Sequence, residues 1–195
     1  RDLHPRVRRQ RQMCIRDSHD TDRFLGEGNN LPMLKQASTL LLTTRRIPQL
    51  YYGTEVMMNG VKSKSDGYVR KDFPGGWTGD ATNALTPAGR TKIQNECYDF
   101  YKTILNWRKG NDVIAKGSMV QFMVQNGVYA YARQYEGKTI FVMLNGTDAE
   151  TTVPLKFYKE ILKDSKQGKD ILSGKAITFG EELKMGPRES LVIEL

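Results

Sequence analysis

The chain has 195 residues, of which 38% are hydrophobic and 18 are glycines, a composition typical of a folded protein with one or two domains. Its longest aliphatic or aromatic run, Ile140 to Leu144, is far shorter than the roughly 20 residues of a transmembrane helix. Two cysteines and two histidines argue against a disulfide framework and against a Cys- or His-based metal site.

The net charge of +8 is concentrated at the N-terminus, where residues 1–18 carry six arginines and two aspartates. No apolar stretch of about 7–15 residues follows, so this segment does not read as a secretory signal. We predict that residues 1–18 are a non-native or disordered basic leader. A nucleic-acid-binding arm is the alternative, but the rest of the chain has no basic stripe with interleaved aromatics.

Helical signals and one short apolar run organise the first half of the chain. An asparagine cap and Pro32 precede apolar residues at helical spacing, which predicts a helix over 32–45. The run 47–52 is apolar on both faces and predicts a buried parallel strand. A long Gly- and Pro-rich loop covers 53–85, and Thr86-Pro87 opens a predicted helix over 87–109 that Gly110-Asn111 ends.

The pattern changes near residues 110–113 to short strands with tight turns. Asn126-Gly127 between two apolar runs predicts a type I′ hairpin, and Glu136-Gly137 predicts a second turn. Further strands are predicted at 151–155, 176–179, 182–185 and 190–195. This spacing is typical of an antiparallel β-sandwich. We therefore predict an α/β segment over 19–110 and an all-β domain over 111–195.

Two groups of residues suggest chemistry. The first is the polar cluster His19-Asp20-Thr21-Asp22-Arg23, which is either part of a cleft or simply a solvated loop. The second is Tyr52 with Glu55, where an aromatic ring and a carboxylate follow the predicted strand. Such residues bind sugar faces and hydroxyls, although packing of the tyrosine in a core explains the pattern equally well.

The long loop adds a third candidate, Asp72 and Trp77 in the run DFPGGW. Because an exposed Trp is costly in water, we expect Trp77 to pack, either over a core edge or along a substrate groove. Cys97 lies on the apolar face of the last helix and is expected to be plain core.

Taken in order, HDTDRF, IPQLYYGTE, RKDFPGGW and LNWRK resemble the C-terminal end of glycoside hydrolase family 13, the α-amylase family. The DFPGGW loop is most similar to the neopullulanase and cyclomaltodextrinase branch. GVYAYAR, GKTIFVMLNG and GKDILSG resemble that family's C-terminal β-sandwich. The resemblance covers about residues 18–195 and implies the last part of a (β/α)8 TIM barrel followed by the sandwich.

The resemblance also implies roles for individual residues. His19 would hydrogen-bond the sugar at the cleavage subsite, and Asp20 would stabilise the transition state. The family's Asn before this pair is Ser18 here, at the point where the basic leader joins. We expect substrate contacts from Asp22, Arg23, Tyr52, Glu55, Asp72 and Trp77.

The family takes its nucleophile and its acid/base from barrel strands four and five, neither of which is recognisable in this chain. Retaining hydrolysis needs both groups, so we expect a catalytically inactive fragment of a hydrolase acting on α-1,4-glucosidic bonds in maltodextrin, cyclodextrin or pullulan. The alternative is a non-catalytic α-glucan-binding module. Hydrolysis requires no cofactor, and structural calcium, oligomeric state and compartment stay open.

Overall fold

The computed structural model describes residues 13–14, 20–45 and 47–195, which form two compact units. One unit holds the described residues up to Leu41 together with 47–102, and the other holds Leu42–Arg45 and Thr103–Leu195. The units therefore divide inside a helix, whereas the sequence places the domain boundary after it, near residue 110.

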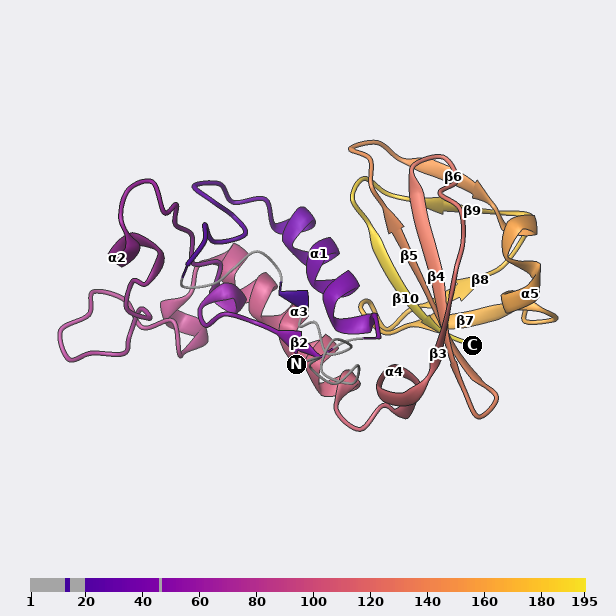
Figure 1. The fold of residues 1–195 in the computed structure, drawn as a ribbon, viewed down its shortest axis with the longest axis horizontal. Helices are drawn as coiled ribbons and strands as arrows, with labels where there is room; N and C mark the ends of the chain where they lie inside the picture. Colours follow the sequence, from indigo (N-terminus) through magenta and orange to yellow (C-terminus); the bar gives the residue numbers. More distant parts are fainter. Residues whose placement is uncertain (1–12, 15–19, 46) are drawn as a thin grey trace, which may run out of the picture. The chain divides into compact units, whose positions relative to one another are not determined.

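The first unit is mostly helix and loop (Figure 1). Two short strands pair in parallel, with Met13 opposite Pro48 and Cys14 opposite Gln49, and α1 connects them in sequence. The elements are β1 (Met13–Cys14), α1 (Leu31–Thr43), β2 (Pro48–Gln49), η2 (Thr54–Val56), α2 (Asp66–Val69), η3 (Pro87–Gly89) and α3 (Lys92–Arg108), where the last turns of α1 and α3 belong to the second unit.

The predicted helices form with small shifts at their starts. Asn30 Oδ1 accepts a hydrogen bond from Met33 N at 3.0 Å, which confirms the asparagine cap of α1. Thr86-Pro87 opens only the 3-10 turn η3, and α3 starts after Thr91. There Thr91 Oγ1 accepts from Gln94 N and Gln94 Oε1 accepts from Thr91 N, a capping box that the sequence pattern Thr-x-x-Gln already contained.

The predicted buried strand over 47–52 is wrong in length and in burial. Only Pro48–Gln49 is a strand, Gln49 is exposed and Ile47 is 61% exposed. A parallel strand is buried when neighbouring strands and helices cover both of its faces. Among the residues that the structure describes, only the two residues of β1 pair with it.

The second unit contains the antiparallel β-domain that the sequence predicts (Figure 1). A six-stranded sheet has the order β3-β4-β5-β10-β7-β8, and β6 pairs with β9 in a second, two-stranded sheet. The strands are β3 (Ser118–Gln121), β4 (Val128–Tyr135), β5 (Lys138–Asn145), β6 (Thr151–Pro154), β7 (Gln167–Asp170), β8 (Ala176–Thr178), β9 (Glu182–Met185) and β10 (Ser190–Glu194), and the short helices are α4 (Asp112–Lys116), η4 (Leu155–Tyr158) and α5 (Lys159–Leu162).

Both predicted turns are confirmed by backbone angles. Asn126 and Gly127 have φ of 49° and 78°, and Glu136 and Gly137 have φ of 48° and 77°. Positive φ at both central residues defines the type I′ turn, whose twist matches that of the strands it joins. The turns fix the register of β3, β4 and β5.

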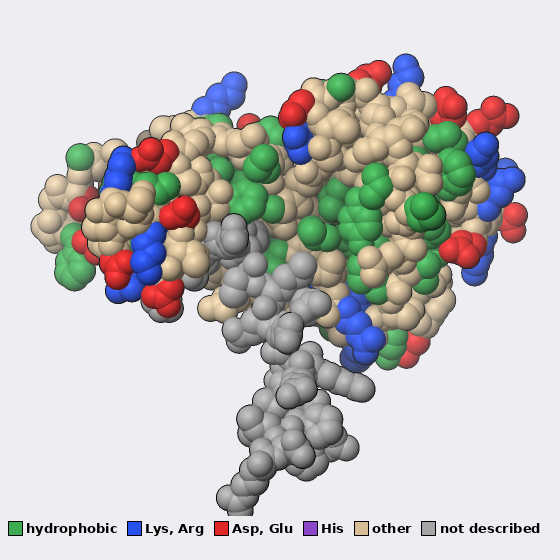
Figure 2. Space-filling model, turned by 45° about the horizontal axis from the view of Figure 1, so that its top comes forward, with side chains coloured by type: hydrophobic (Ala, Val, Ile, Leu, Met, Phe, Trp, Pro, Cys, Tyr) green, Lys and Arg blue, Asp and Glu red, His purple; other side chains and the backbone are tan. Residues whose placement is uncertain are grey.

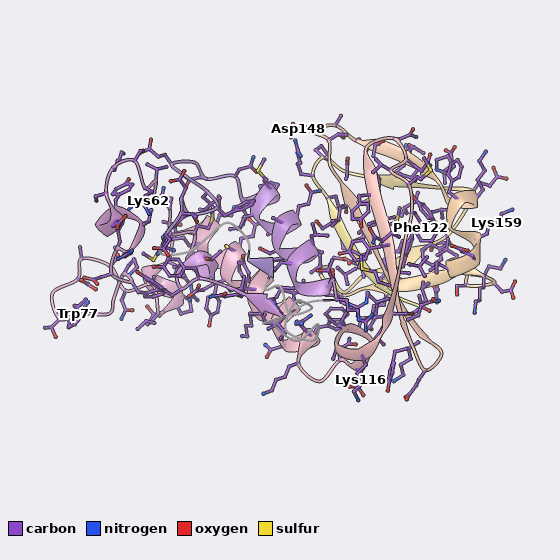
Figure 3. The ribbon with its side chains drawn as sticks, in the orientation of Figure 1. Lys62, Trp77, Lys116, Phe122, Asp148 and Lys159 are labelled. Atoms are coloured by element: carbon purple, nitrogen blue, oxygen red, sulfur yellow. The ribbon has the colours of Figure 1, made fainter. Side chains whose placement is uncertain are left out.

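A single apolar core lies between the two sheets. Along β4, Val128, Ala130 and Ala132 face this core, while Tyr131 and Arg133 point to the opposite face of the sheet. Phe122 packs against the core, and Figure 3 shows it inside the sandwich. The side-chain alternation of the strands therefore produces the layered fold.

Arg133 explains why the end of α1 belongs to the second unit. It is 0% exposed, and its guanidinium donates to the carbonyl oxygens of Ser118, Ile114, Gly117 and Thr43 at 2.8 to 3.1 Å. Arg108 donates to the Leu42 carbonyl. Cations at a helix C-terminus satisfy its free carbonyls and its dipole, so both arginines bind the last turn of α1.

β7 and the short helices α4 and α5 were not predicted. β7 reads Gln-Gly-Lys-Asp, which has no apolar alternation, yet it pairs with both β10 and β8. A Cβ on Gly168 would lie 2.4 Å from Ile193 Cγ2, so glycine permits this close pairing. In the described part of the chain, no helix is both long enough and apolar enough to span a membrane.

Candidate glycan-binding site

The predicted site residues that the structure describes all lie in the first unit, while His19 lies outside the described residues. The segment Thr21–Gly26 and Lys62 line a shallow hollow in this unit. Figure 3 shows Lys62 on this side of the unit and Trp77 at the outer tip of its loop, away from Lys62. The candidate residues therefore occupy more than one part of the unit.

Asp20 and Asp22 face a basic segment that sequence reasoning did not connect with them. Arg70 Nη2 lies 3.3 Å from Asp20 Oδ1 and 3.5 Å from Asp66 Oδ2. Lys62 donates from its backbone N–H to Asp22 Oδ1 at 2.6 Å and from Nζ to the Asp20 carbonyl at 3.0 Å. Both carboxylates are exposed, and both have a basic or N–H partner that orients them.

Arg23 is buried beneath this cluster and serves the protein's own backbone. It is 1% exposed, and its guanidinium donates to the carbonyls of Val69 at 3.0 Å and Tyr52 at 2.8 Å. Its Cζ lies 4.5 Å and 5.0 Å from the ring centroids of Tyr51 and Tyr52. This geometry makes Arg23 a residue that positions Tyr52.

Tyr52 is partly accessible at the surface. It is 40% exposed, its hydroxyl donates to the Lys71 carbonyl at 2.7 Å, and its ring packs edge-on against Tyr51 with centroids 4.6 Å apart. Burial raises the pKa of Tyr51. Packing holds the Tyr51 ring, whereas the Tyr52 ring remains partly accessible. The pair therefore fits both interpretations of this segment, packing in a core and binding of a sugar.

Glu55 lies in η2, half-buried, on the side of the unit where Cys97 packs. Cys97 is fully buried and donates from Sγ to the Thr54 carbonyl at 3.6 Å. Burial raises the pKa of the Cys97 thiol to about 12, with a smaller contribution from the Glu55 charge. Cys97 is core, as predicted.

The Asp72–Asp80 loop corrects one expectation about burial. Trp77 is 69% exposed, so it does not cover a core edge. Asp80 Oδ2 accepts from Gly75 N at 2.7 Å and from Trp77 N at 3.1 Å, and Gly75 has φ of 95°. The loop is shaped by these backbone hydrogen bonds and not by burial of the indole, and Asp72 is exposed beside it.

Sequence reasoning missed Lys62, Arg70 and Asp80. A signal existed for the first two, because the run Lys62 to Lys71 is rich in basic residues and the run from Asp20 to Asp22 is acidic. About forty residues separate the partners, so only the fold brings them together. For Asp80 the signal was a carboxylate closing a Gly-rich loop.

The arrangement is suited to binding hydroxylated ligands. Carboxylates accept hydrogen bonds from hydroxyls, and exposed rings of Tyr52 and Trp77 offer apolar faces. The described residues contain no group of three His, Cys, Asp or Glu side chains that could hold a metal ion. On the face shown in Figure 2, basic and acidic side chains of the described residues are interspersed.

The chain is similar in sequence to known proteins. Residues 119–194 match the family model described as the cyclo-malto-dextrinase C-terminal domain. The chain is 30% identical to an α-amylase of Niallia circulans over 177 residues, which is 87% of this chain and 29% of that protein. It is 31% identical to a cyclomaltodextrin glucanotransferase of Thermoanaerobacterium thermosulfurigenes over 163 residues, 80% of this chain and 20% of that protein.

Solved structures give the same result for the fold. An Anoxybacillus α-amylase matches 94% of this chain and 37% of its own with a TM-score of 0.73 at 21% identity. An α-amylase from Geobacillus thermoleovorans, complexed with acarbose, matches 94% and 38% with a TM-score of 0.71 at 22% identity. The chain spans between a fifth and three tenths of the length of the two curated relatives. The resemblance predicted from the motifs is confirmed.

Proposed function

We propose that this chain, related by sequence and fold to the α-amylase family of glycoside hydrolases, is the C-terminal part of a hydrolase that cleaves α-1,4-glucosidic bonds in maltodextrin, cyclodextrin or pullulan. The observation that carries the proposal is the match of the sandwich to the cyclo-malto-dextrinase C-terminal domain, combined with similarity to an α-amylase over 87% of the chain. The same domain match supports the neopullulanase and cyclomaltodextrinase branch.

In this proposal the first unit is the last part of a (β/α)8 barrel. The order of α1, β2 and α3 supports it, because alternating helices and strands are the repeating pattern of such barrels. Barrel enzymes place their sites at the C-terminal ends of strands. Tyr52 follows β2, and the family resemblance places Asp20 at the end of the preceding barrel strand.

The proposed roles follow from the chemistry of the residues. Asp20 stabilises the positive charge of an oxocarbenium-like transition state, and His19 binds the sugar beside it. Arg70 holds the Asp20 carboxylate, and Arg23 positions Tyr52. Asp22, Glu55, Asp72 and Trp77 are proposed to contact the glucan. Acid/base hydrolysis of this kind needs no cofactor.

Hydrolysis by the retaining mechanism also needs a nucleophilic carboxylate and an acid/base about 5–5.5 Å apart. The chain alone is therefore proposed to be inactive, with the remaining groups supplied by other parts of the barrel. The second candidate is a non-catalytic α-glucan-binding module, which the exposed ring of Trp77 on a loop fixed by Asp80 favours.

One experiment separates the two candidates. The purified chain is incubated with maltoheptaose, and released reducing ends and heat of binding are measured for the protein and for Asp20→Ala and Trp77→Ala. We expect no hydrolysis and only millimolar binding. Hydrolysis that Asp20→Ala removes would contradict the proposed inactivity, while micromolar binding lost in Trp77→Ala would favour the binding module.

A second test reads the source DNA across the codons for Arg16 to Thr21 and upstream. The hydrolase proposal expects an Asn codon directly before His19 and a barrel upstream with an Asp and a Glu at strand ends. A contiguous genomic sequence that keeps the arginine-rich codons, with no barrel upstream, would overturn it.

A further inference from the structure

A pocket in the second unit has a composition that neither the hydrolase nor the core explains. It is formed by η4, α5 and the segments before β7 and β9, and its walls carry four lysines and two glutamates. Leu155 and Leu162 are buried and form its apolar floor, and Phe179 is half-buried. The four lysines are Lys156, Lys159, Lys163 and Lys166.

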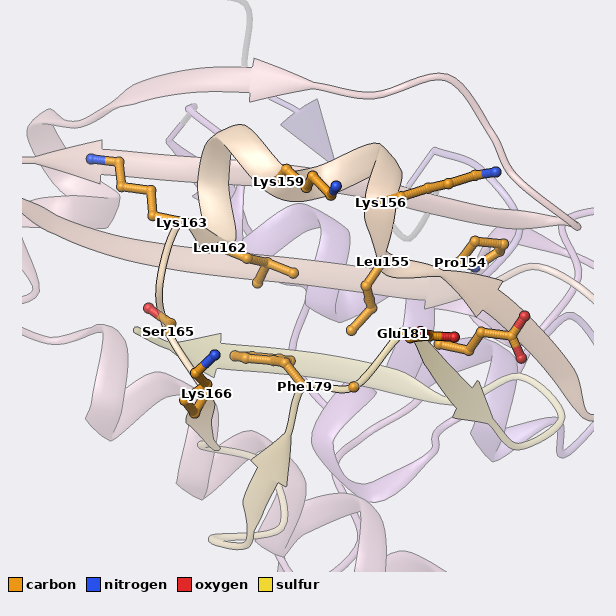
Figure 4. A pocket seen from close by; sticks show the side chains of 12 residues that line it. Pro154, Leu155, Lys156, Lys159, Leu162, Lys163, Ser165, Lys166, Phe179 and Glu181 are labelled. Atoms are coloured by element: carbon orange, nitrogen blue, oxygen red, sulfur yellow. The ribbon is translucent and has the colours of Figure 1, made fainter.

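The pocket has two chemically different ends. Figure 4 shows Lys163, Ser165 and Lys166 at one end, Glu181 and Lys156 towards the other, and Phe179 between the two ends. One end therefore offers ammonium groups and a hydroxyl, the middle offers an aromatic face, and the far end offers a carboxylate beside one further lysine. A ligand that fits all three has an anionic group, an apolar face and hydroxyl donors.

The four lysines have few partners within the protein, and Lys156 Nζ lies 5.3 Å from the ring centroid of Phe157. None of the four forms an ion pair with a carboxylate of another described residue, whereas Lys116 and Lys184 in the same unit do. All four are exposed. Four lysines against the two glutamates Glu181 and Glu182 leave an excess of positive charge around the pocket, which favours an anion.

Lys163 adds a second, independent observation. Its backbone has φ of 48° and ψ of −121°, a conformation that favours glycine. The turn is closed by a hydrogen bond from Ser165 N to the Leu162 carbonyl at 2.9 Å. Strain at a non-glycine residue persists where the surroundings over-determine it and is concentrated at functional sites. Here it holds an ammonium-bearing side chain at the basic end of the pocket.

We propose that this pocket binds an anionic saccharide, with a phosphate or carboxylate group at Lys163 and Lys166, the sugar face on Phe179 and its hydroxyls on Glu181. The carboxylate end disfavours a nucleic-acid strand, whose phosphates would continue past Glu181. The pocket belongs to the second unit, whereas Asp20 and Trp77 belong to the first, and the proposal does not depend on the hydrolase activity.

The test is a calorimetric titration of the whole chain with glucose 6-phosphate, using glucose, inorganic phosphate and AMP as matched probes. We expect glucose 6-phosphate to bind at least about tenfold more tightly than glucose or phosphate, because both ends of the pocket contribute. Raising the salt concentration should weaken its binding. Equal affinity for phosphate and glucose 6-phosphate, or tighter binding of AMP, would overturn the saccharide assignment.

Variants connect the binding to the pocket. Lys163→Gly removes the ammonium group and suits the backbone angle, so we expect weaker binding by about tenfold with an unchanged or higher melting temperature. Lys166→Gln should weaken binding similarly, and Phe179→Leu should reduce the preference over phosphate. Lys169→Gln, at an exposed lysine of β7 outside the pocket, is the control. Unchanged affinity in both lysine variants of the pocket would contradict the proposal.

Discussion

Among the described residues, Arg133 in the second unit and Arg23 in the first are the most deeply buried arginines, and their donation to backbone carbonyls serves different parts of the fold. Arg133 in the second unit bridges four carbonyls from β3, α4, its following residue Gly117 and the end of α1. Arg23 in the first unit bridges the carbonyls of Val69, the last residue of the short helix α2, and of Tyr52 in a loop. Arg133 joins elements around the sandwich, while Arg23 joins a one-turn helix to a loop that carries part of the candidate site.

This difference indicates that the second unit is the more stable one and that the first unit carries the candidate site. The second unit has a continuous ladder from β3 to β8 and one apolar core between its sheets. In the described part of the first unit, the only strand pairing is the two-residue pair of β1 and β2. Regular hydrogen bonds stabilise the sandwich, and individual side chains fix the loops around Asp20 and Trp77.

The largest effect should appear in amide hydrogen exchange. We expect amides of β4, β5 and β10 to exchange at least about 100-fold more slowly than amides of the loop over residues 59–86, because the former open only with the whole sandwich. Exchange measured by mass spectrometry at neutral pH checks this. Equal protection in both units would show that the first unit is stabilised as well as the sandwich.

Replacing the two arginines should sharpen the comparison. Arg133→Met leaves four buried carbonyls without a donor and should cost about 3–5 kcal/mol, whereas Arg23→Met leaves two and should cost about 2–3 kcal/mol. Urea denaturation measures both, and Arg45→Met, at an exposed arginine, is the control. A smaller loss of stability in Arg133→Met than in Arg23→Met would mean that Arg23 contributes more to the unfolding free energy than Arg133.

Replacing Arg23 also tests its proposed role in positioning Tyr52. A residue that positions Tyr52 should change glucan binding only through that ring. We therefore expect Arg23→Met and Tyr52→Ala to weaken binding of maltoheptaose by similar factors, with no additional loss in the double variant. Additive losses would place Arg23 in direct contact with the ligand.

Local patterns predicted the second unit much better than the first. Asn126-Gly127 and Glu136-Gly137 determine the turns, and the alternation of Val128, Ala130 and Ala132 determines the inner face, all within a few residues. The predicted strand over 47–52 failed because burial depends on neighbours that the run itself does not specify. The apolarity of a segment can be read from the segment itself, whereas the strands and helices that bury it come from other parts of the chain.

The candidate site shows the same limit. The types of residue at Asp20, Tyr52 and Trp77 could be read from the sequence, whereas the pairing of Asp20 with Arg70 joins residues fifty positions apart. The exposure of Trp77 was also mispredicted, because hydrogen bonds from Gly75 and Trp77 to Asp80 determine the loop shape. Hydropathy alone does not report such backbone contacts.

The buried Cys97 thiol should make the unfolding free energy of the first unit depend on pH. Its folded pKa is raised to about 12 against 9.0 as the reference, so the unfolded chain releases a proton that the folded chain retains. The contribution to stability is complete below about pH 9 and falls by up to about 1.4 kcal/mol per pH unit towards pH 12. Urea denaturation at pH 8, 9 and 10 should therefore show a steeper loss in the protein than in Cys97→Ala. Parallel losses would mean that water reaches this thiol.

The smallest effect compares the two turns of the sandwich with each other. Gly127 and Gly137 have nearly the same φ, but a Cβ on Gly127 would lie 2.3 Å from Thr147 Cγ2, whereas one on Gly137 has nothing within 4 Å. Thr147 cannot move freely, since its hydroxyl donates to Asn145 Oδ1 at 2.8 Å. Both alanine variants carry the strain of positive φ, about 1 kcal/mol, and Gly127→Ala should lose about 1 kcal/mol more from the clash. Thermal denaturation of the two variants measures this difference directly. Equal melting temperatures would mean that the loop around Thr147 adapts, and that the rigidity assigned to the sandwich does not extend to its turns.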